Sequence, residues 1–132
     1  MSGAPYFIEF YEESSGAKPA LRWIREDLSV RQRRALGHAM YRLLQRYGVG
    51  VCGTEYGRQL GGGLFEFRVR LTSGADGERA LLRVFCHAAG DRVVVLGGYD
   101  KAKAPTRRRQ SAEIAQARRR LRDLQSRAEL EQ

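Results

Sequence analysis

The sequence predicts an α+β fold in which a pair of helices packs on a small sheet. Two observations predict it: some runs alternate apolar and polar residues, and others carry apolar residues three or four positions apart. The chain has 132 residues, of which 42% are hydrophobic and 30% charged, so it can form one domain with a modest core. We expect one domain over residues 1–132, with its core in about 6–110 and a basic C-terminal helix in 111–127.

The first elements are expected to be a strand and a helical hairpin. Residues 6–11 are rich in aromatic and β-branched side chains and are typical of a strand. A first helix begins at Pro19, which the first turn of a helix tolerates, and continues to Leu28. Ser29 is placed to cap a second helix that reaches about Tyr47. The joint between the two helices is so short that they should lie antiparallel.

A glycine-rich stretch separates the hairpin from the rest of the sheet. Residues 48–63 contain seven glycines, which predicts a connection without regular structure. Three strand-like runs follow, at 64–71, 80–88 and 92–99. Short connections over 72–77 and 89–91 favour antiparallel pairing. The expected order is β-α-α-β-β-β-α, with a mostly antiparallel four-stranded sheet.

The last expected helix has an apolar stripe and a strongly basic remainder. Ser111 is a candidate cap. The stripe consists of Ile114, Ala117, Leu121 and Leu124. Because the hairpin already covers the core side of the sheet, we expect this helix at the sheet edge or along the hairpin. Its arginines should then point outward, toward a polyanion.

The charge of the chain favours an anionic partner. Lys and Arg number 24 against 15 acidic residues, a formal net charge of +9, and residues 101–132 hold 10 basic and 4 acidic side chains. Nucleic acid or the ribosome is the leading partner class, through counterion release. An acidic protein partner is the second class. In the remaining interpretation the basic helix surface only keeps the protein soluble.

Composition also excludes several classes of protein. Two cysteines, Cys52 and Cys86, are too few for a disulfide scaffold, and we expect both to be free thiols. No apolar run approaches the roughly 18 residues that a membrane span needs. The segment from Met1 to Tyr11 lacks the basic and apolar regions of a signal peptide. We therefore expect a cytoplasmic protein with no membrane partner.

Strand periodicity predicts one charged face on the sheet. In residues 64–71 the odd positions are apolar, while the even positions include Glu66 and Arg68. If the hairpin covers the apolar side, the polar and charged side chains of the three strands gather on the other side. They are Glu66, Arg68, Arg83, His87, Tyr99 and Lys101.

Such a face fits cleavage of RNA without a metal ion. The reaction needs a base for the 2′-hydroxyl, positive charge for the phosphorane and an acid for the leaving oxygen. Glu66 or Lys101 is the candidate base. His87 or Tyr99 is the candidate acid, and the two arginines can hold the charge. In the alternative interpretation Glu66 only neutralises a neighbouring arginine.

We expect no metal or small-molecule cofactor. The chain has no CxxC or HxxxH spacing. Cys86 and His87, adjacent in one strand, should point to opposite faces.

Several segments together resemble the HigB-type toxins of the RelE/ParE superfamily. They are Arg46-Tyr47-Gly48, residues 58–68 (RQLGGGLFEFR), residues 82–85 (LRVF) and residues 95–101 (VLGGYDK). The family pattern is LGGGLYELR, then RVFY, then LLHGFxKK, and the match runs in order from about Tyr6 to Leu124. The chain departs from it at Cys86 for an aromatic residue, at Ala102 for the second lysine, and at Gln110-Ser111 for a proline.

The resemblance implies a RelE-like fold and a toxin of a type II toxin–antitoxin module. Such a toxin is usually an endoribonuclease that cuts mRNA at the ribosome and inhibits translation. Its expected partners are a cognate antitoxin, the ribosome and mRNA. The matching site residues are Glu66, Arg68, Arg83, Tyr99 and Lys101.

Further basic residues are candidates for contact with RNA or the ribosome. They are Arg70, Lys103, Arg107, Arg108, Arg118, Arg119 and Arg120. The alternative function is a non-catalytic binding toxin of the same superfamily, of the gyrase-inhibitor type, or a nucleic-acid-binding regulatory module.

Overall fold

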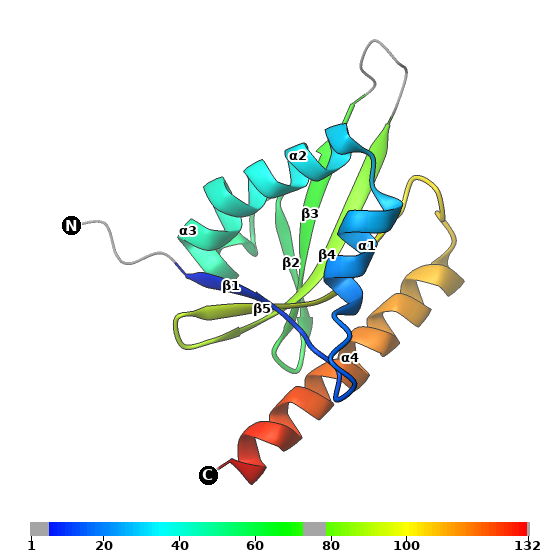
Figure 1. The fold of residues 1–132 in the computed structure, drawn as a ribbon. Coiled ribbons are helices and arrows are strands. Elements are labelled where there is room, and N and C mark those ends of the chain that lie inside the picture. The colour runs from blue at the N-terminus through cyan, green and yellow to red at the C-terminus, as the bar shows by residue number, and fades with distance from the viewer. Residues whose placement is uncertain (1–5, 73–78, 132) are drawn as a thin grey trace, which may run out of the picture.

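The structure is a computed structural model that describes residues 6–72 and 79–131. A five-stranded sheet carries a helical hairpin on one face and a long C-terminal helix on the other (Figure 1). The α+β class with a hairpin on a mostly antiparallel sheet is confirmed. The connection expected over residues 72–77 lies almost entirely outside the described residues. No helix in the described ranges has the length and apolar character that crossing a membrane requires.

The sheet has one strand more than expected. The strands are β1 (Phe7–Phe10), β2 (Gly57–Gly61), β3 (Leu64–Leu71), β4 (Ala80–Ala89) and β5 (Arg92–Asp100). They lie in the order β1-β5-β4-β3-β2, with β1 parallel to β5 and the other pairs antiparallel.

The expectation that residues 48–63 have no regular structure is wrong, because β2 lies within them. Gly61, Gly62 and Gly63 have φ angles of +87°, +64° and +85°. Side chains other than glycine rarely adopt such angles, so the three glycines allow the tight reversal that returns β2 onto β3.

The hairpin begins and is capped where the sequence predicts. Helix α1 spans Pro19–Asp27 with proline in its first turn, and α2 spans Val30–Ala39. Ser29 accepts a hydrogen bond from the backbone nitrogen of Gln32 at 3.1 Å, and the Gln32 side chain accepts one from Ser29 at 3.0 Å. This reciprocal capping box stabilises the start of α2.

After α2 the chain continues in helical turns of other kinds. A π-helical turn, η1, spans Met40–Leu44 and is followed by α3 (Gln45–Tyr47) and the 3-10 turn η2 (Gly48–Val51). The second helix thus ends near Tyr47, as expected.

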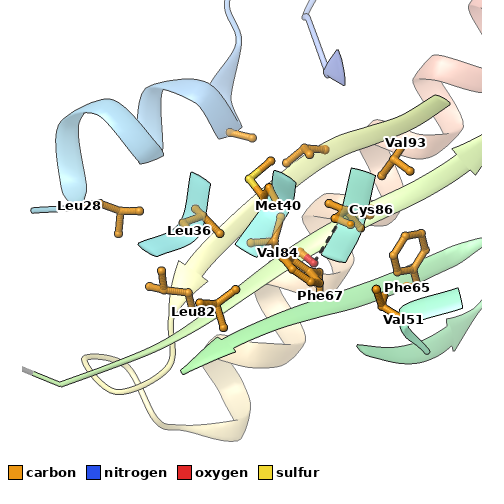
Figure 2. Packing of buried hydrophobic residues seen from close by; sticks show 14 of the residues in the cluster. Leu28, Leu36, Met40, Val51, Phe65, Phe67, Leu82, Val84, Cys86 and Val93 are labelled. Carbon is orange, nitrogen blue, oxygen red and sulfur yellow. Dashed lines mark hydrogen bonds between the residues drawn. The ribbon is translucent and has the colours of Figure 1, made fainter. Parts of the chain in front are cut away.

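The core under the hairpin is built from alternate residues of the strands. Figure 2 shows Phe65, Phe67, Leu82, Val84 and Cys86 on the side of the sheet that faces Leu36 and Met40. Burial of each large apolar side chain contributes about 1.5–3 kcal/mol. Cys86 is a core thiol, as expected, and burial raises its pKa far above the ordinary value, so it remains protonated.

The C-terminal helix packs differently from the expectation. Helix α4 spans Arg107–Leu130 and is capped by Thr106, whose side chain accepts a hydrogen bond from the backbone nitrogen of Arg109. This cap lies five residues before the expected cap at Ser111. It lies across the face of the sheet opposite the hairpin (Figure 1). Its buried residues Ala117 and Leu121 pack with apolar side chains of β3, β4 and β5, namely Leu64, Phe85, Val94 and Leu96.

Placement of α4 at the sheet edge or along the hairpin is therefore wrong. The physical reason is that the second face of the sheet is only partly charged. Its apolar part needs cover, and the apolar stripe of α4 supplies it.

Candidate active site

Three adjacent strands place three polar side chains in one row. Arg68 of β3 pairs in register with Arg83 of β4, and Arg83 pairs with Tyr99 of β5. Neighbouring strands lie about 4.8 Å apart, so these side chains emerge side by side on the α4 face. Glu66 precedes Arg68 by two residues and shares that face. We refer to Glu66, Arg68, Arg83 and Tyr99 as the Glu66 cluster.

A buried carboxylate holds the two arginines of the cluster. Glu66 is 0% exposed, and its Oε1 accepts a hydrogen bond from Nε of Arg68 at 2.8 Å. The same oxygen lies 3.6 Å from Nε of Arg83, whose side chain is 11% exposed. Two guanidinium groups directly opposite each other repel, and Glu66 compensates for this repulsion. The cluster keeps one net positive charge, which favours an anion such as a phosphodiester.

Tyr99 forms the inner wall of the cluster. It is 1% exposed, and its ring stacks on Phe85 with centroids 6.2 Å apart. Burial is the main cause that raises the pKa of Tyr99, Glu66 raises it further, and Arg83 acts in the opposite direction. The hydroxyl is therefore protonated at neutral pH and is a hydrogen-bond donor. Burial also lowers the pKa of the Arg83 guanidinium, while Glu66 opposes that shift.

The cluster contains buried polar atoms without hydrogen-bond partners in the described chain. They are Oε2 of Glu66, Nε of Arg83 and the hydroxyl of Tyr99. Buried polar groups are nearly always paired, and exceptions mark strain, a catalytic role or a ligand that completes the bonding. Three such atoms on one small patch therefore favour a binding or catalytic role over a purely structural one.

Basic residues continue from the cluster toward one end of the sheet. Arg70 is exposed, two residues beyond Arg68 on β3. Lys101 is half-buried in the turn after β5, and its backbone nitrogen donates to the carbonyl of Leu81 at 2.8 Å. Lys101 and Arg79 border a cavity of about 510 Å³. The charged face thus extends past Tyr99 as a positive surface.

His87 lies apart from the cluster. It follows Arg83 by four residues on β4, a separation of roughly 13 Å along a strand, with Phe85 between them. Its Nδ1 is 2.7 Å from the carbonyl oxygen of Gly63, in the turn between β2 and β3. The structure brings Glu66, Arg68, Arg83 and Tyr99 together and places this candidate acid elsewhere.

Three arginines of α4 donate to backbone carbonyls outside the helix, contrary to the expectation that its arginines face outward. Arg127 donates to the carbonyl oxygen of Glu12 at 2.6 Å. Arg118 donates to the carbonyl oxygens of Leu60 and Gly61 at 2.6 and 3.0 Å. Arg120 donates to the carbonyl oxygen of Leu96 at 2.7 Å. Because α4 lies flat on the sheet, side chains beside its apolar stripe reach backbone carbonyls at strand ends and bulges.

The other basic candidates are on the surface. Arg119 is exposed and contacts the side chain of Gln116. The remaining three are exposed in the turn before α4 and in its first turn, namely Lys103, Arg107 and Arg108. Their side chains are accessible to solvent.

Sequence reasoning missed two features of the site. The guanidinium carbon of Arg109 lies 5.6 Å from the centroid of the Tyr99 ring, and its Nε donates to Glu113 at 2.7 Å. A cap at Thr106 was the available signal, because it starts α4 early enough to bring Arg109 over the strand. The apolar run Val93–Leu96 also indicates a strand buried on both faces, which predicts a cover for the second face.

The described residues contain no evident metal site. Within residues 6–72 and 79–131, no three His, Cys, Asp or Glu side chains come together as a possible set of ligands. The one carboxylate of the cluster already faces two arginines. We therefore assign no described residue to a metal or cofactor.

Comparison with protein families identifies the family to which the chain is related. The family model described as phage derived protein Gp49-like (DUF891) matches residues 22–122, which include most of the hairpin, the Glu66 cluster and most of α4. Neither curated proteins nor solved structures gave a match. The family is of the toxin–antitoxin type and belongs to the RelE group of toxins, which suggests an antitoxin as partner. The chain therefore belongs to the Gp49-like family of phage-derived proteins.

Proposed function

We propose that this protein is a HigB-type toxin that cuts mRNA on the ribosome, as an endoribonuclease that uses no metal ion. The Glu66 cluster supports the proposal most strongly, because it joins two arginines, a carboxylate and a protonated phenol on one patch. Membership of a toxin family in the RelE group adds independent support.

The reaction is an attack within the RNA chain. The 2′-oxygen bonds to the adjacent phosphorus while the bond from phosphorus to the 5′-oxygen breaks, leaving a 2′,3′-cyclic phosphate and a 5′-hydroxyl. A base takes the proton of the 2′-hydroxyl, and an acid gives a proton to the 5′-oxygen. Between these events the phosphate gains negative charge, which Arg68 and Arg83 are placed to stabilise.

Tyr99 is the acid in this proposal. Its raised pKa keeps the proton on the hydroxyl, and that hydroxyl has no other partner in the described chain. His87 is not assigned to this step, because its ring contacts Gly63 at the far end of β4.

Two residues are candidates for the base. Glu66 offers Oε2, which has no hydrogen-bond partner, beside both arginines. Lys101 lies two residues beyond Tyr99 at the border of the positive surface. Glu66→Gln and Lys101→Gln, compared by the pH dependence of single-turnover cleavage, separate them, because only removal of the base abolishes the acidic limb of the profile.

The exposed basic residues serve the approach to the ribosome. Lys103, Arg107, Arg108 and Arg119 have the exposure that long-range attraction to ribosomal RNA needs. The family type also implies a cognate antitoxin that neutralises the toxin.

Primer extension on a translated message tests the proposal. Wild type should produce discrete cuts, and Arg68→Ala should abolish them. Arg92→Ala is the matched control, since Arg92 also lies on a strand but pairs with Glu9 far from the cluster. Equal message integrity with wild type and Arg68→Ala contradicts the proposal. DNA damage without translational arrest would instead indicate a binding toxin of the gyrase-inhibitor type.

A further inference from the structure

A second cavity shares Tyr99 with the Glu66 cluster. It has a volume of about 360 Å³ and is formed by the end of α1, the end of β5 and the turn into α4. The lining residues used in the argument are Trp23, Asp27, Tyr99, Asp100, Lys103 and Arg109. β1 pairs with β5 only along Arg92–Val95, so the cavity adjoins the part of β5 that β1 does not cover.

Close packing of α1 on β5 shapes this cavity. The ring of Trp23 lies directly on Gly98, where even a Cβ atom would come within 2.4 Å of it. Asp27 follows Trp23 by one helical turn, and Asp100 follows Gly98 by two residues on the same face of the strand. The tryptophan ring and the two carboxylates therefore belong to the same cavity wall.

The carboxylates are available for hydrogen bonds from a ligand. Oδ1 of Asp100 accepts from the backbone nitrogens of Leu81 and Ala102 at 3.0 and 2.9 Å. Oδ2 of Asp100 has no partner in the described chain, although the residue is only 7% exposed. Asp27 is exposed and forms no ion pair with any described residue. The cavity therefore offers acceptors with unused capacity next to an aromatic surface.

We infer that this cavity binds a nucleobase, and that guanine is the base it prefers. An indole ring supplies a stacking surface for any base. Guanine carries two adjacent N–H donors, at N1 and N2, which match two carboxylate acceptors. Its O6 is an acceptor beside them, and Lys103 and Arg109 supply cationic donors at the cavity. The other three bases present a single donor position on this edge.

The position of the cavity connects the base to the chemistry. Tyr99 lines the cavity and also pairs in register with Arg83 of the Glu66 cluster, so a base in the cavity would lie next to the cluster. The inference that this cavity selects a base of the mRNA rests on the proposed function. The cavity then determines next to which nucleotide the toxin cuts.

Trp23 is the only tryptophan in the chain, so its fluorescence reports on the cavity. Titration of the full chain with GMP, AMP, CMP and UMP should give a saturable change with GMP at a concentration at least tenfold lower than with the others. Asp27→Asn should reduce this preference at least tenfold, because the amide keeps one acceptor oxygen but loses the negative charge and presents an N–H donor that cannot pair with the guanine donors. Glu26→Gln is the matched control, an adjacent exposed acidic residue outside the cavity, and should keep it. No change in fluorescence, equal responses to the four nucleotides, or an Asp27→Asn protein with the same preference for GMP as wild type each overturns the inference.

A cleavage assay run beside the binding titration separates this inference from the proposed function. Arg68→Ala should bind GMP like wild type, since Arg68 is outside the cavity. If wild type prefers GMP but cuts no message, the inference that the cavity binds guanine holds and the proposed function fails. If wild type cuts messages without any preference for GMP, only the cavity inference fails. When both hold, primer extension should show cuts adjacent to guanine that Asp27→Asn redistributes.

Discussion

The hydrogen bond from Nε of Arg68 to Oε1 of Glu66, 2.8 Å long, joins a partly exposed guanidinium to a fully buried carboxylate two residues away on one strand. Arg68 is 32% exposed, so its outer part reaches solvent while its inner part is held by the protein. A guanidinium positioned before RNA binds needs less reorganisation during the reaction.

Replacing Glu66 should therefore destabilise the fold as well as the site. Glu66→Gln removes the charge that faces Arg68 and Arg83, and we expect a loss of about 1–3 kcal/mol in the free energy of unfolding. Glu9→Gln is the control, because its pair with Arg92 is exposed and worth at most about 1 kcal/mol. Urea unfolding of the three proteins measures both losses. Equal, small losses in the two variants would show that the buried carboxylate is not needed by its arginines.

Tyr99→Phe should separate activity from stability. The hydroxyl has no partner in the described chain, so its removal should leave the free energy of unfolding unchanged or slightly higher. Loss of a general acid should nevertheless lower the cleavage rate by about 100-fold or more. Tyr11→Phe is a control with the opposite expected result. The Tyr11 hydroxyl donates to Asp123, so removal of that hydroxyl should reduce stability but not cleavage. Undiminished cleavage by Tyr99→Phe contradicts the acid role.

Stability should fall at alkaline pH because of two buried tyrosines. Burial is the main cause that raises the pKa of Tyr11 and of Tyr99, and Asp123 and Glu66 respectively raise it further. Below pH 10, both groups are protonated in the folded and unfolded chains, and their contribution is fully present. As the pH rises through about 10, the unfolded chain ionises first, and this contribution is lost up to the higher folded pKa values.

Urea unfolding at pH 8 and pH 10.5 tests the pH dependence. Wild type should lose more stability between the two pH values than the double variant Tyr11→Phe, Tyr99→Phe, in which only other groups titrate. A double variant with the same loss as wild type shows that these two phenols are not the cause.

Arg118 and Arg120 should stabilise the docking of α4 more than they attract RNA. Each donates a charged hydrogen bond to backbone carbonyls of the sheet, so Arg118→Gln and Arg120→Gln should each cost about 1–2 kcal/mol. Arg119→Gln should leave stability within about 0.5 kcal/mol and should reduce the salt dependence of ribosome co-sedimentation. Chemical unfolding and co-sedimentation of the three single variants measure both effects. A stability loss in Arg119→Gln equal to that of its neighbours contradicts this division.

Local patterns in the sequence determined most elements of the fold. Pro19 and Ser29 mark the starts of α1 and α2 because their preferences act within one helical turn. Alternation in β3 determined which side chains share a face, and with it the common side of Glu66 and Arg68, because successive residues of a strand point to opposite faces. The resemblance to toxin sequences pointed to the same residues.

Tertiary structure alone decided the features that depend on distant segments. The register of β3, β4 and β5 places Arg83 between Arg68 and Tyr99, and Glu66 is fully buried beside them. Neither feature follows from a local pattern. The placement of α4 depended on how much apolar surface the second face left uncovered. The cavity beside Trp23 likewise required α1 to meet the end of β5. Periodicity determines which face a side chain occupies, whereas burial and partners are set by whichever element packs on that face.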